Sequence, residues 1–284
     1  MRVLSTVAEM RAVRASLPGL VGLVPTMGYL HDGHLALVRA ARAANASVVV
    51  SIFVNPAQFG PGEDLATYPR DLDRDLALLE SDGVDLVFAP PEHEMYPPGD
   101  AVTVDPGPIG ARLEGAARPE HFLGVVTVVT KLLGLVQPDR AYFGQKDAQQ
   151  LAVIEHVVQV LFLPVEIVAC PTVRERDGLA LSSRNVYLTP TQRVAAPALY
   201  RGLASASKGW REGERSPERL RAAVCAEVVP ERELRLEYVS VAHPRTLDEL
   251  ETVPPVGVLL SLAARAGRVR LIDNIRLGKE GATE

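Results

Sequence analysis

The sequence is poor in several residue types, and each shortage excludes a class of protein. Among 284 residues there are two cysteines, four lysines and 5% aromatic side chains. The cysteines, Cys170 and Cys225, lie far apart, so they form neither a disulfide framework nor a zinc cluster and are typical of a reducing compartment. A net charge of −5 leaves no basic excess for binding nucleic acid. The longest apolar runs, 48–54 and 122–136, are too short or too interrupted to span a membrane.

What is present is the composition of a globular protein. Apolar residues make up 47% and charged residues 23% of the chain, and its length is enough for one or two domains. Glu9 lies where a secretory signal would be apolar, so we expect no export. We therefore expect a cytoplasmic enzyme that has neither nucleic acid nor a membrane as a partner.

Strand and helix signals alternate through the first part of the chain. Short apolar, β-branched runs predict strands, and apolar residues at helical spacing predict helices. The predicted strands are 19–24, 47–54, 85–88, 140–143 and 165–169, and the predicted helices are 32–45, 70–81, 122–136 and 148–161, with Asp32 as N-cap of the first. This alternation indicates parallel βαβ units, so we predict an α/β fold with a Rossmann-like, doubly wound parallel sheet. Ligands of such sheets bind at the carboxyl ends of the strands.

The pattern changes near Thr189. Pro190 opens a long helical segment, and the polar residues 205–217 are typical of a connection. Strand-like runs follow at 234–242, 256–263 and 269–275. We interpret this part as a smaller C-terminal α+β domain, and we place the two predicted domains at residues 1–182 and 183–284.

The segment 25–34 (PTMGYLHDGH) carries the strongest chemical signal. It leaves a predicted strand, turns at Gly28 and enters a helix with His31 and His34 three residues apart, so both imidazoles can share the first turn. The N–H groups of a helix start bind anions, and two imidazole donors beside them suit a triphosphate whose leaving pyrophosphate gains charge. The alternative is half of a zinc site, which the other histidines do not complete. We favour the phosphate interpretation.

Uncharged amides follow the second predicted strand, in the segment 53–60 (FVNPAQFG). Asn55 and Gln58 would suit a substrate with hydroxyl groups and a carboxylate that must itself react. An ordinary Asn-Pro turn explains this segment equally well.

Two later segments also offer phosphate contacts. In 141–150 (AYFGQKDAQQ), Lys146 could bind phosphate and Asp147 a ribose hydroxyl or an amine, with Gln150 one turn further on; for Asp147 a solvated Lys-Asp pair is the alternative. Downstream of Val173, the segment 181–185 (LSSRN) offers small hydroxyl donors and a forked cation. These suit a closing phosphate clamp, and a polar turn between domains is the alternative.

Weaker candidates lie between these segments. Arg118 and His121 precede a predicted helix, where functional and structural interpretations are evenly balanced. The three aspartates at 71, 73 and 75 favour a solvated helix start over a metal site, and residues 63–64 favour a loop tip.

Five segments in this order resemble the pantoate–β-alanine ligase family, within the nucleotidyltransferases that share an HxGH signature: 25–34, 53–60, 118–125 (RPEHFLGV), 142–150 and 181–185. The resemblance covers nearly the whole chain. It implies an enzyme that condenses pantoate with β-alanine through a pantoyl adenylate, giving pantothenate, AMP and pyrophosphate for coenzyme A biosynthesis. It also implies ATP as a substrate, Mg²⁺ as a cofactor, and a homodimer in which the smaller domain closes as a lid over ATP.

The resemblance assigns roles to individual residues. Catalysis falls to His34, the family's proton donor, with His31 and Lys146. The implied ATP-binding residues are Met27, Gly28, Tyr29, Leu30, His31, Asp32, Gly33, His34, Gly144, Gln145, Lys146, Asp147, Val173, Leu181, Ser182, Ser183 and Arg184. Gln58, Gln150 and Asn55 would contact pantoate, and Gln58 also β-alanine; the resemblance gives no Mg²⁺ ligand.

Two residues depart from the family pattern: Leu181 stands where Met is usual, and Glu120 where Gly is common. Other HxGH adenylyltransferases are the nearest alternative, and they would lack the pair Gln58 and Gln150. A non-catalytic nucleotide-binding module would not need His31, His34 and Lys146 together.

Overall fold

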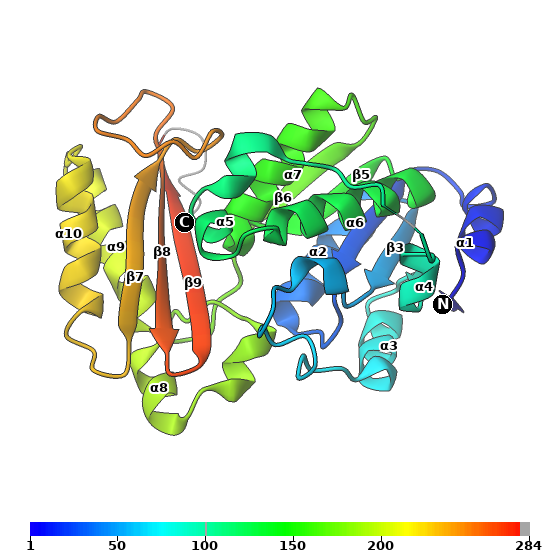
Figure 1. The fold of residues 1–284 in the computed structure, drawn as a ribbon, viewed down its shortest axis with the longest axis horizontal. Helices are drawn as coiled ribbons and strands as arrows, with labels where there is room; N and C mark the ends of the chain where they lie inside the picture. The colour runs from blue at the N-terminus through cyan, green and yellow to red at the C-terminus, as the bar shows by residue number, and fades with distance from the viewer. Residues whose placement is uncertain (100, 279–284) are drawn as a thin grey trace. The chain divides into compact units, whose positions relative to one another are not determined.

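The computed structural model describes residues 1–99 and 101–278, which form two compact units (Figure 1). The first unit contains residues 1–145 and 149–170, and the second contains residues 146–148 and the chain from Pro171 onward. The predicted domain boundary between residues 182 and 183 stays a prediction. The last six residues of the predicted C-terminal domain, 279–284, lie outside the described part of the chain. No helix in the described part of the chain is both long and apolar enough to cross a bilayer.

The first unit is built on a six-stranded parallel sheet with the order β1-β4-β3-β2-β5-β6, which confirms the predicted doubly wound fold. Its strands are β1 (Arg2–Leu4), β2 (Val21–Thr26), β3 (Ser47–Ile52), β4 (Leu86–Phe88), β5 (Arg140–Gly144) and β6 (Glu166–Cys170). From β2 the chain builds outward through β3 and β4, and then returns to the other side of β2 with β5. The strand order therefore reverses between β2 and β5.

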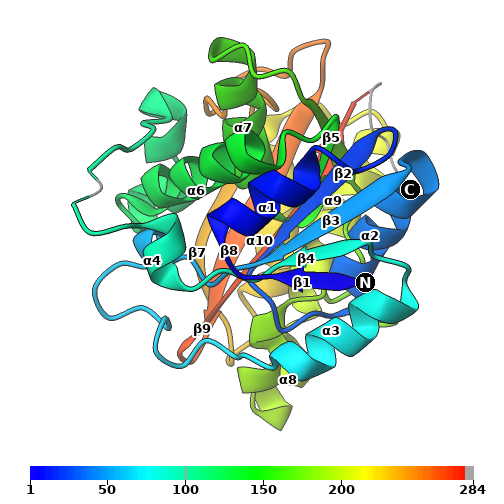
Figure 2. The same cartoon turned by 90° about the vertical axis from the view of Figure 1, so that its right-hand side faces the viewer.

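Helices and 3₁₀ turns connect these strands. They are α1 (Val7–Arg14), α2 (Asp32–Ala44), η1 (Pro56–Gln58), α3 (Leu72–Ser81), α4 (Glu92–Met95), η2 (Gly107–Ala111), α5 (Glu114–Ala117), α6 (His121–Val136), η3 (Gln145–Asp147) and α7 (Ala148–Val160). Side chains of α2 and α3 share one apolar cluster with alternate residues of β3, whose remaining side chains are also buried. The helices α1 and α6 lie side by side (Figure 2). Burial on both faces explains why the central strands read as continuous apolar runs.

Two details of the first predicted βα unit are wrong. The strand β2 runs through Pro25 to Thr26, and Pro25 pairs with Ser51 of β3. The pairing of β2 with β5 is confined to Gly22 and Leu23, so the N–H that Pro25 lacks disturbs no hydrogen bond on the β5 side. The N-cap of α2 is His31, whose imidazole accepts the N–H of Gly33, and not Asp32.

The second unit contains a three-stranded antiparallel sheet with the order β7-β8-β9, which confirms the predicted α+β character. Its elements are η4 (Ser183–Tyr187), α8 (Pro190–Ala195), α9 (Ala198–Arg211), α10 (Pro217–Val228), β7 (Arg235–Ala242), β8 (Val258–Ala266) and β9 (Val269–Leu277). The helices α9 and α10 lie against this sheet (Figure 1). The core is formed by one apolar stripe from each of the two helices packed against the sheet.

The expected connection at 205–217 is wrong for most of its length. The helix α9 continues to Arg211, because Leu199, Leu203 and Ala206 form a buried stripe while the rest of its surface is polar. The helix α10 was not predicted, although Leu220, Val224 and Val228 recur every four residues and are buried.

Candidate active site

The topology places the predicted site residues of the first unit at one edge of its sheet. The loops that follow β2, β3 and β5 leave the carboxyl ends of three adjacent parallel strands. In doubly wound sheets ligands bind at this edge, where the strand order reverses, which here is between β2 and β5. Met27–His31 lie on the loop after β2, and Asp32–His34 form the first turn of α2. Asn55 and Gln58 follow β3, and Gln150 lies in the first turn of α7 after β5.

The turn between β2 and α2 is unusual in its backbone. Gly28 has φ +80° and Tyr29 has φ +49°, so two successive residues are left-handed. A side chain at Gly28 would be strained, and its Cβ would lie 3.0 Å from Ile52 and 3.1 Å from the Asp75 carboxylate. The hydroxyl of Thr26 supports the turn by accepting the N–H of Gly28 at 3.2 Å.

Asp75 of α3 holds this turn by hydrogen bonds to its backbone. Its carboxylate is only 1% exposed, and it accepts the N–H groups of Tyr29 at 2.6 Å and Leu30 at 2.7 Å. Burial raises the pKa of Asp75, against the opposing effect of the two N–H donors. The prediction of a solvated helix start is therefore wrong for Asp75, although Asp71 and Asp73 are exposed as expected.

The two histidines of the HxGH segment form a stacked pair at the start of α2. Their ring centroids are 4.0 Å apart with an angle of 27° between the planes. The Nδ1 atom of His31 accepts the N–H of Gly33 at 3.1 Å, and the Nδ1 atom of His34 accepts the N–H of His31 at 3.3 Å. A ring nitrogen that accepts an N–H carries no proton, so each neutral imidazole has its proton on Nε2. The backbone thus orients two N–H donors of the same kind.

The loop after β3 is tied both to the β2 loop and to α6. Asn55 is 1% exposed, and its amide donates to Gln58 Oε1 and to the carbonyl of Gly124, both at 3.1 Å. The Gln58 amide donates to the sulfur of Met27 at 3.2 Å. The structure therefore brings together Met27, predicted to bind ATP, with Asn55 and Gln58, predicted to bind pantoate.

An ion pair that the sequence did not reveal lies beside this loop. Arg118 donates to both oxygens of Glu63, at 2.7 and 2.5 Å, so Glu63 is more than a loop tip. Burial alone would raise the pKa of Glu63, but the hydrogen bonds and charge of Arg118 outweigh it, so the pKa is lowered. Arg118 and His121 also converge on the carbonyl oxygen of Gln58.

After β5 the chain carries two adjacent glutamines with different surroundings. Gln149 is buried, accepts the N–H of Glu114 at 2.9 Å and donates to the carbonyls of Ile109 and Arg112. Gln150, the predicted pantoate contact, is half-buried in the first turn of α7. Gln149 therefore anchors the 109–114 segment, a role that its sequence neighbourhood does not indicate.

Of the other predicted ATP contacts, Gly144 and Gln145 lie at the end of β5 and the start of η3 in the first unit, and the rest belong to the second unit. Lys146 lies 3.5 Å from Asp147, and its carbonyl accepts the side-chain amide of Asn274 at 2.7 Å. Val173 and Leu181 are bonded through their backbones at 3.0 Å, as neighbours on a short hairpin, and Ser182 caps η4 by accepting the N–H of Arg184. Because the bond between Leu181 and Val173 is made by the backbone, leucine in place of methionine leaves the hairpin pairing intact.

The same hairpin is pinned within the second unit. Arg174 forms a two-pronged ion pair with Asp273, at 2.6 and 2.8 Å, and its guanidinium lies 4.2 Å from the ring centre of Tyr200. At the hairpin tip, a Cβ on Gly178 would lie 2.2 Å from the Tyr200 ring. These contacts hold Val173 and Leu181 in register.

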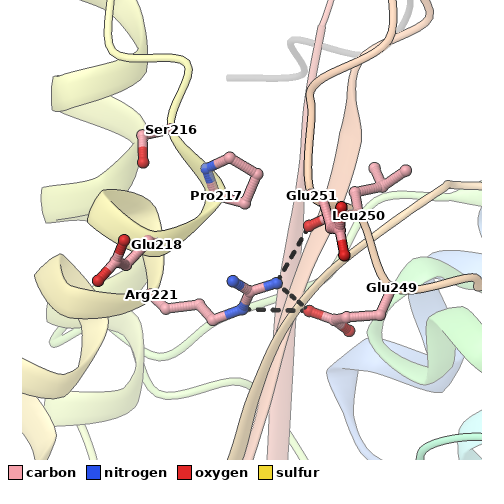
Figure 3. A pocket seen from close by; sticks show the side chains of 7 residues that line it. All are labelled: Ser216, Pro217, Glu218, Arg221, Glu249, Leu250 and Glu251. Carbon is pink, nitrogen blue, oxygen red and sulfur yellow. Dashed lines mark hydrogen bonds and ion pairs between the residues drawn. The ribbon is translucent and has the colours of Figure 1, made fainter.

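A pocket of about 350 Å³ in the second unit is lined by Ser216, Pro217, Glu218, Arg221, Glu249, Leu250 and Glu251 (Figure 3). The predicted site residues are absent from its lining. Arg221 crosses it to pair with Glu249 and the carbonyl of Leu250, so its one cation is already engaged. Among the described residues there is also no cluster of three or more His, Cys, Asp or Glu side chains able to hold a metal ion.

Comparison with known proteins decides the family. A family model described as pantoate-beta-alanine ligase matches residues 2–276. The chain belongs to the pantoate–β-alanine ligase family. It is 61% identical to the pantothenate synthetase of Roseiflexus sp. (strain RS-1) over 274 residues, which cover 96% of this chain and 98% of that protein.

Solved structures of the pantoate–β-alanine ligase family match nearly the whole chain. Pantothenate synthetase from Thermus thermophilus has a TM-score of 0.93 and 53% identity, with 98% of this chain and 100% of that chain covered. Pantoate-beta-alanine ligase from Francisella tularensis, in complex with beta-gamma ATP and beta-alanine, has a TM-score of 0.80 and 36% identity, with 97% of both chains covered. The chain is therefore a ligase that condenses pantoate with β-alanine using ATP, which confirms the predicted family and reaction.

Proposed function

We propose that the ligase activates pantoate as a pantoyl adenylate. A pantoate carboxylate oxygen forms a bond to the α-phosphorus of ATP, and the bond from that phosphorus to the pyrophosphate oxygen breaks. The amine of β-alanine then attacks the acyl carbon, loses a proton, and AMP leaves with the oxygen it received. This route requires donors for the leaving pyrophosphate and no nucleophile from the protein.

The pair His31 and His34 is the observation that supports this route best. Both rings carry their proton on Nε2 and lie at the start of α2, beside the strand edge where ligands of this fold bind. Hydrogen bonds to a developing anion act without reorganisation when the donors are already oriented. We assign His34 as proton donor and His31 as its partner in stabilising pyrophosphate.

Substrate contacts follow the family resemblance and the loops on which these residues lie. We assign ATP to residues 27–34, to 144–147, to Val173 and to 181–184, with Lys146 at the phosphates. We assign pantoate to Asn55, Gln58 and Gln150, and β-alanine to Gln58. Residues 183–284 are proposed as the lid.

Magnesium is proposed to reach the enzyme bound to ATP. The described residues offer no cage of side chains for a metal ion. Mg²⁺ is commonly held by substrate phosphates and water with few protein ligands, so MgATP is the form in which the enzyme would take its substrate.

The cellular context is also part of the proposal. The family resemblance implies a homodimer, which light scattering on the purified protein tests directly. A reaction that consumes ATP, together with two free cysteines, supports a cytoplasmic location.

Release of pyrophosphate tests the adenylate route. With MgATP and pantoate alone, the enzyme should release one pyrophosphate per active site in a rapid burst, and adding β-alanine should give sustained turnover with AMP and an amide product. Pyrophosphate release that requires β-alanine from the first turnover contradicts a separate adenylation step. Formation of ADP and phosphate contradicts the route altogether.

A further inference from the structure

We infer that Glu63, Arg118 and His121 form a positioning chain that fixes the backbone of Gln58 and thereby sets the affinity for pantoate. None of the three is assigned to the substrate. The inference rests on the proposed role of Gln58 in binding pantoate, and it adds the residues that hold Gln58 in place.

The carbonyl oxygen of Gln58 is the end point of this chain. Gln58 is the last residue of the 3₁₀ turn η1, where carbonyl groups lack partners within the turn. Two side chains provide the missing donors: His121 Nδ1 lies 2.8 Å from this oxygen, and Arg118 Nη2 lies 3.2 Å from it. Gln58 as a whole is only 9% exposed, so water can contribute little here.

The donor and acceptor roles of His121 are decided by its neighbours. A carbonyl oxygen only accepts, so Nδ1 must carry the proton that it donates to Gln58. A guanidinium only donates, so Nε2, which lies 3.2 Å from Arg118 Nη1, must be the bare acceptor. His121 is therefore neutral in this arrangement and has a single tautomer.

Glu63 fixes the orientation of Arg118. Its two carboxylate oxygens bind Nε and Nη2 of the guanidinium in a fork, which leaves Nη1 directed at His121. One planar group thus connects Glu63, His121 and the Gln58 carbonyl. Removing Glu63 frees Arg118 to rotate away from both of its other partners.

The same turn is held rigidly on its other side. A Cβ on Gly124 of α6 would lie 2.2 Å from the carbonyl oxygen of Ala57, so the helix and the turn are in direct contact. Asn55, oriented by the Tyr96 hydroxyl at 2.7 Å, holds the Gln58 side-chain oxygen. The backbone carbonyl and the side chain of Gln58 are both held, so its side-chain amide has one orientation at the carboxyl ends of the strands. Loss of either set of hydrogen bonds would allow the side chain several rotamers.

Acid should break the positioning chain at His121. The groups that face His121 are Arg118, Glu63, Glu114 and the ring of Phe122. Burial, and then the charge of Arg118, lower the pKa of His121 to about 4, while Gln58, Glu63 and Glu114 act in the opposite direction. A proton on Nε2 would face the guanidinium donor and remove its acceptor. The KM for pantoate should therefore be independent of the state of His121 above about pH 5 and rise as the pH approaches 4.

Two substitutions of His121 separate the hydrogen bond from the bulk of the ring. His121→Asn keeps an N–H donor close to the position of Nδ1, whereas His121→Phe keeps the ring and loses the donor. We expect the KM for pantoate to rise by about tenfold or more in His121→Phe and by no more than about threefold in His121→Asn, with the KM for ATP within about twofold in both. Glu63→Gln should raise the KM for pantoate by several-fold. The exposed His156→Phe is the matched control and should leave both constants unchanged.

The possible results are distinguishable. A folded His121→Phe enzyme with a wild-type KM for pantoate, or with equal increases in the KM for pantoate and ATP, overturns the inference. If His121→Phe does not fold, an unchanged KM for pantoate in folded Glu63→Gln overturns it instead. Gln58→Ala tests the foundation: if it raises the KM for pantoate while the His121 and Glu63 variants do not, the inference alone fails, and if Gln58→Ala has no effect, the proposed role of Gln58 fails first.

Discussion

At the scale of residues, the orientation of two imidazoles follows from backbone N–H groups. The N–H of Gly33 and that of His31 each occupy an Nδ1 atom, which leaves the protons of His31 and His34 on Nε2. In most helices a Ser, Thr or Asp oxygen would fill this capping position. Here the cap is an imidazole, so the side chain that caps the helix is also the one that we propose to donate to phosphate.

Replacing His34 should slow adenylation strongly. We expect His34→Ala to lower the rate of pantoate-dependent pyrophosphate release by about 100-fold, the scale of one oriented donor lost from a transition state. Single-turnover measurements with MgATP and pantoate give this rate. His156→Ala, an exposed histidine on α7, is the control and should be unaffected. A His34→Ala enzyme within a few-fold of wild type would remove His34 from catalysis.

Replacing Asp75 should affect both stability and catalysis. In Asp75→Asn one of the two N–H groups, of Tyr29 or Leu30, faces another donor, and leaving a buried donor unpaired costs about 1–3 kcal/mol. We expect a lower melting temperature and adenylation slowed by about tenfold or more, since the turn leads directly into His31. The matched control is Asp73→Asn, an exposed aspartate on the same helix, which should change neither. Equal behaviour of the two variants contradicts the positioning role of Asp75.

The individual residues of the candidate site could be predicted from the sequence only in part. The HxGH segment, Asn55 and Gln58 follow strands in the structure as the sequence predicted, and their roles at the substrates stay proposals. The role of Asp75 was not identifiable from the sequence, because burial depends on which helix packs under the turn, and three alternating aspartates look solvated. The Glu63–Arg118 pair joins residues 55 positions apart, and no local pattern indicates such a contact.

At the scale of elements, the ends of helix α6 are unusual. Its N-cap Glu120 has φ +71° and its C-cap Gln137 has φ +45°, so both are left-handed residues other than glycine. This explains why glycine is common at position 120 in the family pattern, because the backbone there has the conformation that glycine adopts without strain. Nothing in the structure explains why glutamate stands there in this chain. The exposed glutamate side chain has no capping hydrogen bond to compensate.

Glycine should therefore stabilise this helix start. We expect Glu120→Gly to raise the free energy of unfolding by roughly 1 kcal/mol, because relief of left-handed strain exceeds the entropy gained by the unfolded chain. Denaturant unfolding measures the change. The control Glu80→Gly, at an ordinary helical position near the end of α3, should lower stability by a similar amount. A destabilised Glu120→Gly would show that the strain is compensated by a contact of the side chain.

Elements were predictable where burial is uniform along them. The strands β2 and β3 are covered on both faces, so their apolar runs marked them to within about two residues. The helix α9 was cut short because its buried stripe is narrow and its remaining surface is polar. For α10 the helical spacing of Leu220, Val224 and Val228 was present in the sequence, but the charged and small residues between them made the segment look like a connection.

At the scale of the whole molecule, stability should depend on pH through His121. The unfolded chain binds a proton at this histidine near pH 6.5, while the folded chain does so only near the lowered pKa of about 4. Between these values the unfolded state holds more protons, so the free energy of unfolding falls as the pH drops. At pH 5 this group should cost about 2 kcal/mol relative to pH 7.

Denaturant unfolding of two variants isolates that contribution. His121→Asn has no titrating group at this position, so its loss of stability between pH 7 and pH 5 should be smaller than that of the wild type by about 2 kcal/mol. His156→Asn removes an exposed histidine and should keep the wild-type dependence. Parallel pH profiles for the wild type and His121→Asn would contradict a buried neutral His121.

The central claim is that pantoate is activated at its carboxylate by the α-phosphate of ATP, and the fate of one oxygen atom tests it most directly. Pantoate labelled with ¹⁸O in both carboxylate positions should be converted, with MgATP and β-alanine, to pantothenate that retains one label. The AMP should carry one ¹⁸O per turnover, because the bond formed in the first step is the bond that stays with the phosphate in the second. Unlabelled AMP, or label found in pyrophosphate or phosphate instead, would contradict the adenylate route.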